Sequence, residues 1–265
     1  MGSTLEVALW VWMILDLALG SVLLPEVNDQ KFIAQCVNEH NTARSSVRPP
    51  ASNMLYMTWD EGLAITARAW AKQCVFEHNI HLKDARRMHP IFLSVGENIW
   101  AGYPPSLFNV SRAIKKWVDE KQDYNYRANT CTNVCGHYTQ VVWASSYKVG
   151  CAAQLCPKGV ANISTKEGVV FVCNYATAGN INGQQPYETQ GAACSGCKDT
   201  CKDRLCHSTA RDSQRSYNWT PDWDSSPAHA SSYVTILIVR PVALIFTFIT
   251  AYIVHYTYPN VFFYE

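Results

Sequence analysis

The sequence predicts an α+β domain that is exported from the cell and cross-linked by disulfide bonds. Helical spacing of apolar residues marks the first part of the domain, and two segments rich in valine, aromatic residues and cysteine follow. Eleven cysteines in 265 residues indicate a disulfide framework, and their odd number leaves at least one thiol outside it. The formal net charge of +1 gives no argument for nucleic acid as a partner.

The chain begins with a predicted signal peptide over residues 1–20. The segment from Leu9 to Leu19 is almost wholly apolar, and it ends in a small-residue cleavage pattern at Gly20. This run is too short to span a bilayer comfortably. The alternative is a buried N-terminal helix, since Asp16 lies inside the run and no Lys or Arg precedes it.

Three helices are predicted next. The spacing of Phe32, Cys36 and His40 indicates the first helix, and the prolines at 49–50 end it. The second helix opens at Asp60, a residue that caps helices well. The third runs from about residue 111 to residue 121.

Two strands are predicted after these helices, over residues 147–156 and 168–175, with a loop at 159–166 between them. Residues 137–143 are ambiguous. Their β-branched content favours a strand, and their spacing allows a short helix.

The C-terminal part of the chain divides by composition. Residues 191–207 contain four cysteines and predict a small cross-linked knob. Residues 208–232 are polar and rich in serine, as in a stalk. Residues 233–256 are mostly apolar and predict a transmembrane helix, which leaves 257–265 as a short cytoplasmic tail.

Two features leave the nature of this tether open. Arg240 and Pro241 interrupt the apolar run, although Arg240 could reach the outer headgroups and proline is tolerated at a kink. The tail has no Lys or Arg to set its orientation. The alternatives are a secreted protein, or a lipid anchor attached near Ser225 to Ser232.

Several polar residues are candidates for modification or chemistry. Asn-x-Ser/Thr sequences predict glycosylation at Asn109, Asn162 and Asn218. Four further residues are candidates for a functional site because of their local sequence context, although their spacing in the sequence does not predict that they lie together. They are His78, Glu97, Glu120 and His137.

Several longer motifs resemble those of the CAP superfamily, the cysteine-rich secretory and pathogenesis-related proteins. Residues 136–143 read GHYTQVVW, and residues 170–180 read VFVCNYATAGN. Shorter matches are GEN at 96–98 and WVDE at 117–120. The resemblance implies a three-layer α-β-α sandwich of the SCP-like type over residues 29–190.

The resemblance also implies an open cleft that brings the two His and two Glu residues together. His78 and His137 would then bind Zn²⁺ or another divalent cation weakly, because two protein ligands leave most coordination positions to water. Glu97 and Glu120 would orient the imidazoles, or one of them would act as a general base. In the family, His137 lies on a short helix.

Five disulfide bonds follow from the same resemblance, with Cys36 left over as a buried thiol. The implied pairs are Cys74–Cys156, Cys151–Cys173, Cys131–Cys135, Cys194–Cys201 and Cys197–Cys206.

Three functions compete. The first is a membrane-tethered extracellular binding module for a protein, a lipid or a sterol. The second is a metal-dependent hydrolase or protease, in which Glu97 or Glu120 activates water beside the cation. No His-Glu-x-x-His motif supports it. The third is ion-channel modulation, as in venom relatives that carry a further cysteine-rich lobe after the hinge. No cysteine follows Cys206 in this sequence, so such a lobe is missing and this function is disfavoured.

Overall fold

The computed structural model describes residues 24–224 and 230–258. The chain divides into two compact units, Met1–Asp224 and Ser225–Glu265. The predicted signal peptide over residues 1–20 lies outside the described residues, and so do residues 259–265 of the predicted tail.

The first two helices begin where aspartates cap them. Helix α2 spans Gln30–Ser45, and the carboxylate of Asp29 accepts hydrogen bonds from the first backbone N–H groups of the helix. Helix α3 spans Glu61–Ala71, and Asp60 caps it in the same way. Both helices agree with the prediction from apolar spacing and capping residues.

The ambiguous segment near residue 137 is helical. Helix α4 spans Val110–Asp119, and a 3-10 turn, η2, continues it over Glu120–Asp123. Helix α5 spans Gly136–Val141 and carries His137 near its start. Glu120 therefore lies at the junction of α4 and η2, where the α-helix gives way to the 3-10 turn, and not within a regular α-helix.

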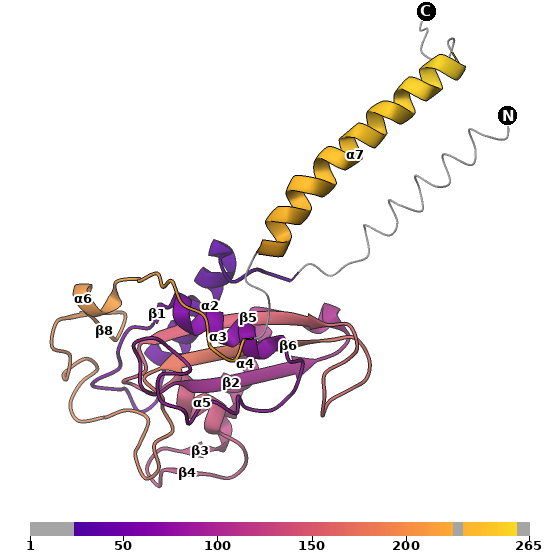
Figure 1. Ribbon diagram of the computed structural model, residues 1–265. Helices are drawn as coiled ribbons and strands as arrows, with labels where there is room; N and C mark the ends of the chain where they lie inside the picture. Colours follow the sequence, from indigo (N-terminus) through magenta and orange to yellow (C-terminus); the bar gives the residue numbers. More distant parts are fainter. Residues whose placement is uncertain (1–23, 225–229, 259–265) are drawn as a thin grey trace, which may run out of the picture. The chain divides into compact units, whose positions relative to one another are not determined.

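A four-stranded sheet forms the centre of the first unit, in the order β1-β5-β6-β2 (Figure 1). Strand β1 pairs in parallel with β5, and the other pairs are antiparallel. The strands are β1 (Thr58–Trp59), β5 (Lys148–Cys156), β6 (Gly168–Ala176) and β2 (Gly96–Gly102).

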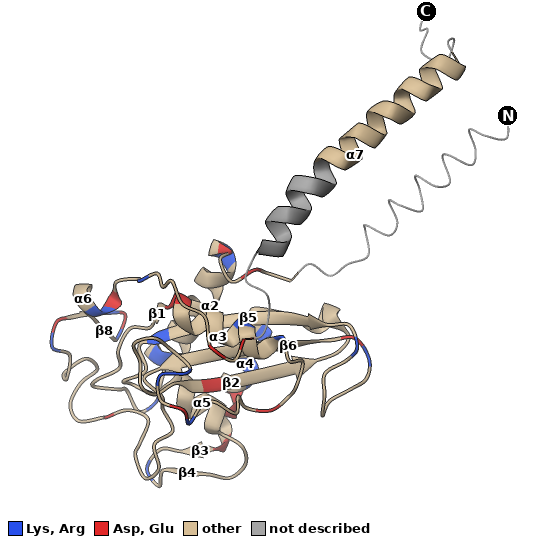
Figure 2. Cartoon of the chain, in the orientation of Figure 1, with Lys and Arg blue, Asp and Glu red and all other residues tan. Residues whose placement is uncertain are grey.

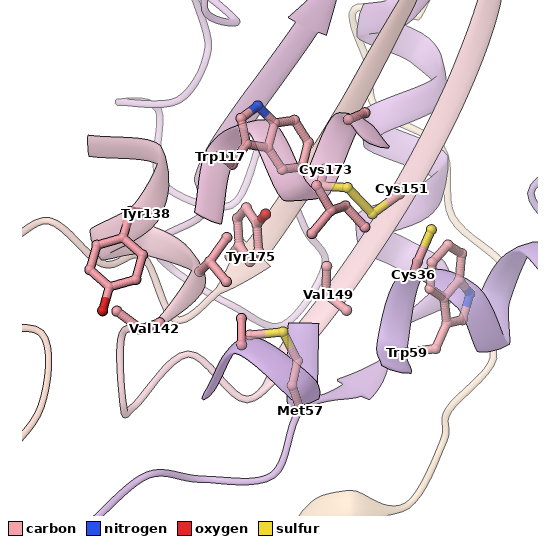
Figure 3. Packing of buried hydrophobic residues seen from close by; sticks show 14 of the residues in the cluster. Cys36, Met57, Trp59, Trp117, Tyr138, Val142, Val149, Cys151, Cys173 and Tyr175 are labelled. Atoms are coloured by element: carbon pink, nitrogen blue, oxygen red, sulfur yellow. A yellow bond between two sulfur atoms is a disulfide. The ribbon is translucent and has the colours of Figure 1, made fainter. Parts of the chain in front are cut away.

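Helices cover both faces of this sheet and make three layers. On one face, α3 packs so closely that a Cβ added at Gly150 of β5 would lie 2.1 Å from the backbone nitrogen of Ala64. On the other face, Trp117 of α4 stacks on Phe171 of β6 with their ring centroids 5.4 Å apart. The Cys151–Cys173 disulfide joins β5 to β6 in this core, near Trp117 (Figure 3).

The structure contains the five disulfide bonds that the family resemblance implies, and the thiol of Cys36 is free and buried. All five bonds and the three hydrophobic core clusters lie within residues 24–224. Among the described residues, this range therefore contains the disulfide framework and the hydrophobic core of a folded domain.

Short elements complete the first unit. They are η1 (Pro105–Leu107), β3 (Tyr124–Asn125), β4 (Thr130–Cys131), β7 (Thr200–Lys202), β8 (Leu205–His207) and α6 (Thr209–Asp212). Strands β7 and β8 form a hairpin within the cysteine-rich knob, where two disulfides hold it.

The start of the predicted stalk lies on the domain. In the segment 208–224, the hydroxyl of Tyr217 donates to Asp60 Oδ2 at 2.8 Å. The indole N–H of Trp223 donates to the carbonyl of Arg87 at 3.1 Å. Composition predicted an extended segment, but these aromatic side chains find partners on the surface of the domain.

The second unit contains helix α7, Ala230–Thr257, with Pro241 inside it. Measured by length and apolarity over the described residues, no helix reaches what a membrane crossing needs. The predicted span over 233–256 therefore stays a prediction.

Arg44 of α2 is buried and acts as a hub for backbone carbonyls. Its guanidinium donates to the carbonyl oxygens of Leu55, Val141, Trp143 and Ala144, at distances from 2.6 to 3.1 Å. Burial lowers the pKa of Arg44 to about 9, so the side chain keeps its charge at neutral pH. These bonds fix the C-terminal end of α5 against α2.

We expect Arg44→Met to lower the free energy of unfolding of residues 24–224 by at least about 3 kcal/mol, because four carbonyl oxygens, three of them buried, each lose a hydrogen bond from a charged donor. Arg112→Met is the matched control, since Arg112 is exposed on α4 and should cost no more than about 0.5 kcal/mol. Urea unfolding of the oxidised fragment measures both. Equal losses in the two variants would contradict the role of Arg44.

Candidate functional site

The first pair of the candidate site joins His78 to Glu97. His78 Nδ1 lies 2.9 Å from Glu97 Oε1, and the same oxygen accepts the backbone N–H of Asn79 at 2.9 Å. The Glu97 side chain is fully buried, whereas that of His78 is 61% exposed. With the Asn174 amide in the orientation that satisfies its surroundings, its nitrogen donates to Glu97 Oε2 at 3.3 Å.

The second pair joins His137 to Glu120. His137 Nδ1 lies 2.6 Å from Glu120 Oε1. The other carboxylate oxygen accepts the backbone N–H groups of His137 and Tyr138, at 3.0 and 3.3 Å. The ring of His137 also stacks on that of Trp117. Glu120 thus holds both the ring and the start of α5.

Strand β2 connects the two pairs. Glu97 lies on it, and the neighbouring Asn98 donates through Nδ2 to the carbonyl of His137 at 3.0 Å. Neighbouring side chains of a strand point to opposite faces. The pairs therefore approach β2 from different sides, and β2 is an edge strand of the sheet. Glu97 is the only charged residue of β2, and Figure 2 shows a red segment on this strand.

The four residues form two pairs and not one compact cluster. Among the described residues, the only group of three or more His, Cys, Asp or Glu side chains with ligand atoms mutually within 4.8 Å is Cys194, Cys197 and Cys206. All three of these cysteines are in disulfide bonds. The assignment of His78 and His137 as metal ligands stays a prediction.

The pKa values of the first pair reflect burial and hydrogen bonding. The hydrogen bond to Glu97 raises the pKa of His78. Burial raises the pKa of Glu97, against the opposing effect of its bonds to His78 and Asn79. The raised pKa of His78 favours its charged imidazolium form, so a cation that binds at Nε2 would have to displace a proton.

The sequence did not predict a buried network of hydrogen-bonded polar side chains that supports His137. His40 Nδ1 lies 2.7 Å from the carbonyl of Cys36, and its Nε2 lies 2.8 Å from the hydroxyl of Tyr175. That hydroxyl also accepts from Asn98 Nδ2 at 3.2 Å, and Asn98 holds the carbonyl of His137. The only signal in the sequence was a histidine on the apolar face of the first helix.

This arrangement is suited to presenting imidazoles. In each pair a carboxylate occupies Nδ1, which fixes the ring orientation and directs Nε2 to a ligand. Two imidazoles held in this way could bind a divalent cation that keeps several water molecules. The first pair is the more accessible, because His78 is largely exposed and the side chain of His137 is 25% exposed.

The architecture is that of a disulfide-bonded α-β-α sandwich with His–Glu pairs at an edge strand. The family described as "CAP: Cysteine-rich secretory protein family" matches residues 37–175. The chain belongs to this family. The prediction from the signature motifs is thereby confirmed.

Relatives and solved structures agree with this assignment. Glioma pathogenesis-related protein 1 of Mus musculus is 44% identical over 260 residues, which cover 96% of each chain. GLIPR1-like protein 1 of Bos taurus is 48% identical and covers 74% of this chain and 80% of its own. The crystal structure of NaASP2 with Zn²⁺ is 27% identical with a TM-score of 0.54, over 70% of this chain and 100% of the other.

We expect the stability of the domain to fall as the pH falls from about 6.5 to 4, because of His40. Burial lowers the pKa of His40 to about 4 in the folded state. The unfolded chain takes up this proton at a higher pH, so acid favours unfolding, by on the order of 3 kcal/mol at pH 4. Urea unfolding across this range should show a shallower loss in His40→Gln. If the unfolding free energies of the wild type and of His40→Gln fall in parallel with pH, His40 is not the cause.

Proposed function

We propose that this protein is a membrane-tethered extracellular binding module with an open divalent-cation site in its cleft. The observation that carries the proposal is the pairing of each imidazole with a carboxylate at Nδ1. Among the described residues, no hydrogen bond to Nε2 of His78 or of His137 is recorded. These two nitrogen atoms are the proposed ligands of Zn²⁺ or a similar cation.

The occupied carboxylates favour binding over hydrolysis. A general base needs a free oxygen within reach of the water that it activates. Glu120 uses both oxygens on His137 and the start of α5. Glu97 is buried and bonded to His78 and Asn79. The Glu97 side chain is fully buried away from water, and each oxygen of Glu120 already accepts a hydrogen bond that orients His137 or the start of α5.

The compartment and the tether are parts of the proposal. Five disulfide bonds persist in an oxidising environment, which supports an extracellular or lumenal location. Residues 241–257 of α7 carry no Lys, Arg, Asp or Glu, and the described part of the helix is uniformly tan in Figure 2. The tether would present the cleft to a nearby extracellular protein, or to a lipid or sterol.

We expect residues 24–224 to bind Zn²⁺ with modest affinity, and the His78→Ala/His137→Ala variant to bind at least about 100-fold more weakly. Glu120→Gln should weaken binding by about 10- to 100-fold, because the carboxylate orients the imidazole. Calorimetric titration measures each affinity. His207→Ala is the control, since His207 stacks on Tyr56 away from the site. Equal Zn²⁺ affinity in the wild-type fragment and the double variant would contradict the proposed metal site.

We expect the full chain to stay with membranes after alkaline carbonate extraction, and a chain ending at Asp224 to be released. A retained apolar helix resists this treatment, because its removal would expose the helix to water. Fractionation followed by immunoblotting gives the result. Release by a phospholipase specific for phosphatidylinositol would indicate a lipid anchor in place of the span.

A further inference from the structure

The loop at residues 79–93 is irregular but anchored. His89 is fully buried, and its Nδ1 accepts the backbone N–H groups of Ile91 and Phe92 at 3.1 Å. The hydroxyl of Thr66 donates to the carbonyl of Met88 at 2.6 Å. These bonds hold the loop in one conformation on the surface of α3, so its outward side chains are presented from a fixed frame.

The apolar residues of the loop fall into a buried set and an exposed set. Leu82, Met88 and Phe92 pack into a core cluster with Leu63 and Ala176. The other set faces water. It consists of Ile80, Ile91 and Leu93, which are 73%, 51% and 62% exposed. Three large aliphatic side chains on one anchored loop are more than the scattered apolar residues of an ordinary surface.

Two cations accompany the exposed aliphatic residues. Lys83 and Arg86 are exposed, and neither has an ion pair among the described residues. The third cation, Arg87, is different because Asp84 and Asp222 neutralise it. Exposed aliphatic residues and unpaired Lys and Arg on one loop are the combination that interfacial protein segments use on lipid headgroups.

The same loop lies where the first unit ends. Asp222 pairs with Arg87, and the ring of Trp223 stacks on that of His81 with centroids 5.1 Å apart. Five residues, 225–229, separate Asp224 from the start of α7. Even fully extended, they reach only about 20 Å. The proposed tether would therefore keep a bilayer within reach of this loop.

We propose that Ile80, Ile91 and Leu93 dock the domain on the bilayer that holds its tether, with Lys83 and Arg86 on lipid phosphates. The proposal rests on the proposed tether. Such docking would hold the domain in one orientation on the membrane and place His78, which precedes the loop, close to the lipid surface. The short linker raises the local concentration of lipid, so weak contacts suffice.

Vesicle binding by residues 24–224 tests the loop without the tether. We expect co-sedimentation with phosphatidylcholine vesicles that contain phosphatidylserine, and weaker binding to phosphatidylcholine alone. Ile80→Ser/Leu93→Ser should reduce binding by about tenfold, and Lys83→Gln/Arg86→Gln should abolish the preference for the anionic lipid. The matched control is Leu107→Ser/Ile181→Ser, because these side chains are 50% and 48% exposed elsewhere.

The full chain in phosphatidylcholine vesicles provides the second measurement. Hydrogen exchange of the backbone at 79–93 should be slower than in the free fragment, and the Ile80→Ser/Leu93→Ser variant should lose this difference. Absence of fragment binding to both kinds of vesicle, or equal binding by variant and control, would overturn the proposal. Self-association of the fragment that depends on Ile80 and Leu93, without vesicle binding, would assign the surface to a second copy instead.

Failure of the tether has a different signature. It would appear as release of the full chain by carbonate, while binding of the 24–224 fragment to vesicles persists. Failure of the docking surface would leave carbonate resistance unchanged and remove the fragment's binding.

Discussion

The buried guanidinium of Arg44 is the interaction on which the geometry of the site depends. A charged side chain in a protein interior is costly unless every donor finds an acceptor. Arg44 meets this condition with carbonyl oxygens alone, from Leu55 and from the end of α5 at Val141, Trp143 and Ala144. Because these carbonyls belong to separate segments, one side chain joins α2, the loop before β1 and the helix that carries His137.

A hydrogen-bonded network on the central sheet also positions the candidate site. Asn98 sits on β2 between the hydroxyl of Tyr175 and the carbonyl of His137, and His40 of α2 completes the chain. All of these groups are neutral and each has a partner, so the network positions His137 without placing a second charge in the core. On the other side of β2, Glu97 gives the same support to His78.

The 79–93 loop differs from the rest of the surface because it exposes three large aliphatic side chains. The 208–224 segment packs back onto the domain through Tyr217 and Trp223. Its end therefore lies beside the 79–93 loop, which precedes β2 and follows His78. The proposed cation site and the exposed aliphatic residues lie close to the end of the first unit, because His78 directly precedes the loop and Trp223 stacks on His81 of that loop.

The linear sequence was enough to predict the family, the main helices, two of the four strands of the central sheet and the four candidate site residues. It could do so because capping residues, apolar spacing and the motifs around His137 are local patterns. The three-dimensional structure was needed to show that the four residues form two His–Glu pairs and that Arg44 and Asn98 support them. It also decided that the predicted stalk begins on the domain. These features depend on contacts between residues up to 157 positions apart, and a linear pattern carries no signal for a hydrogen bond between such distant residues.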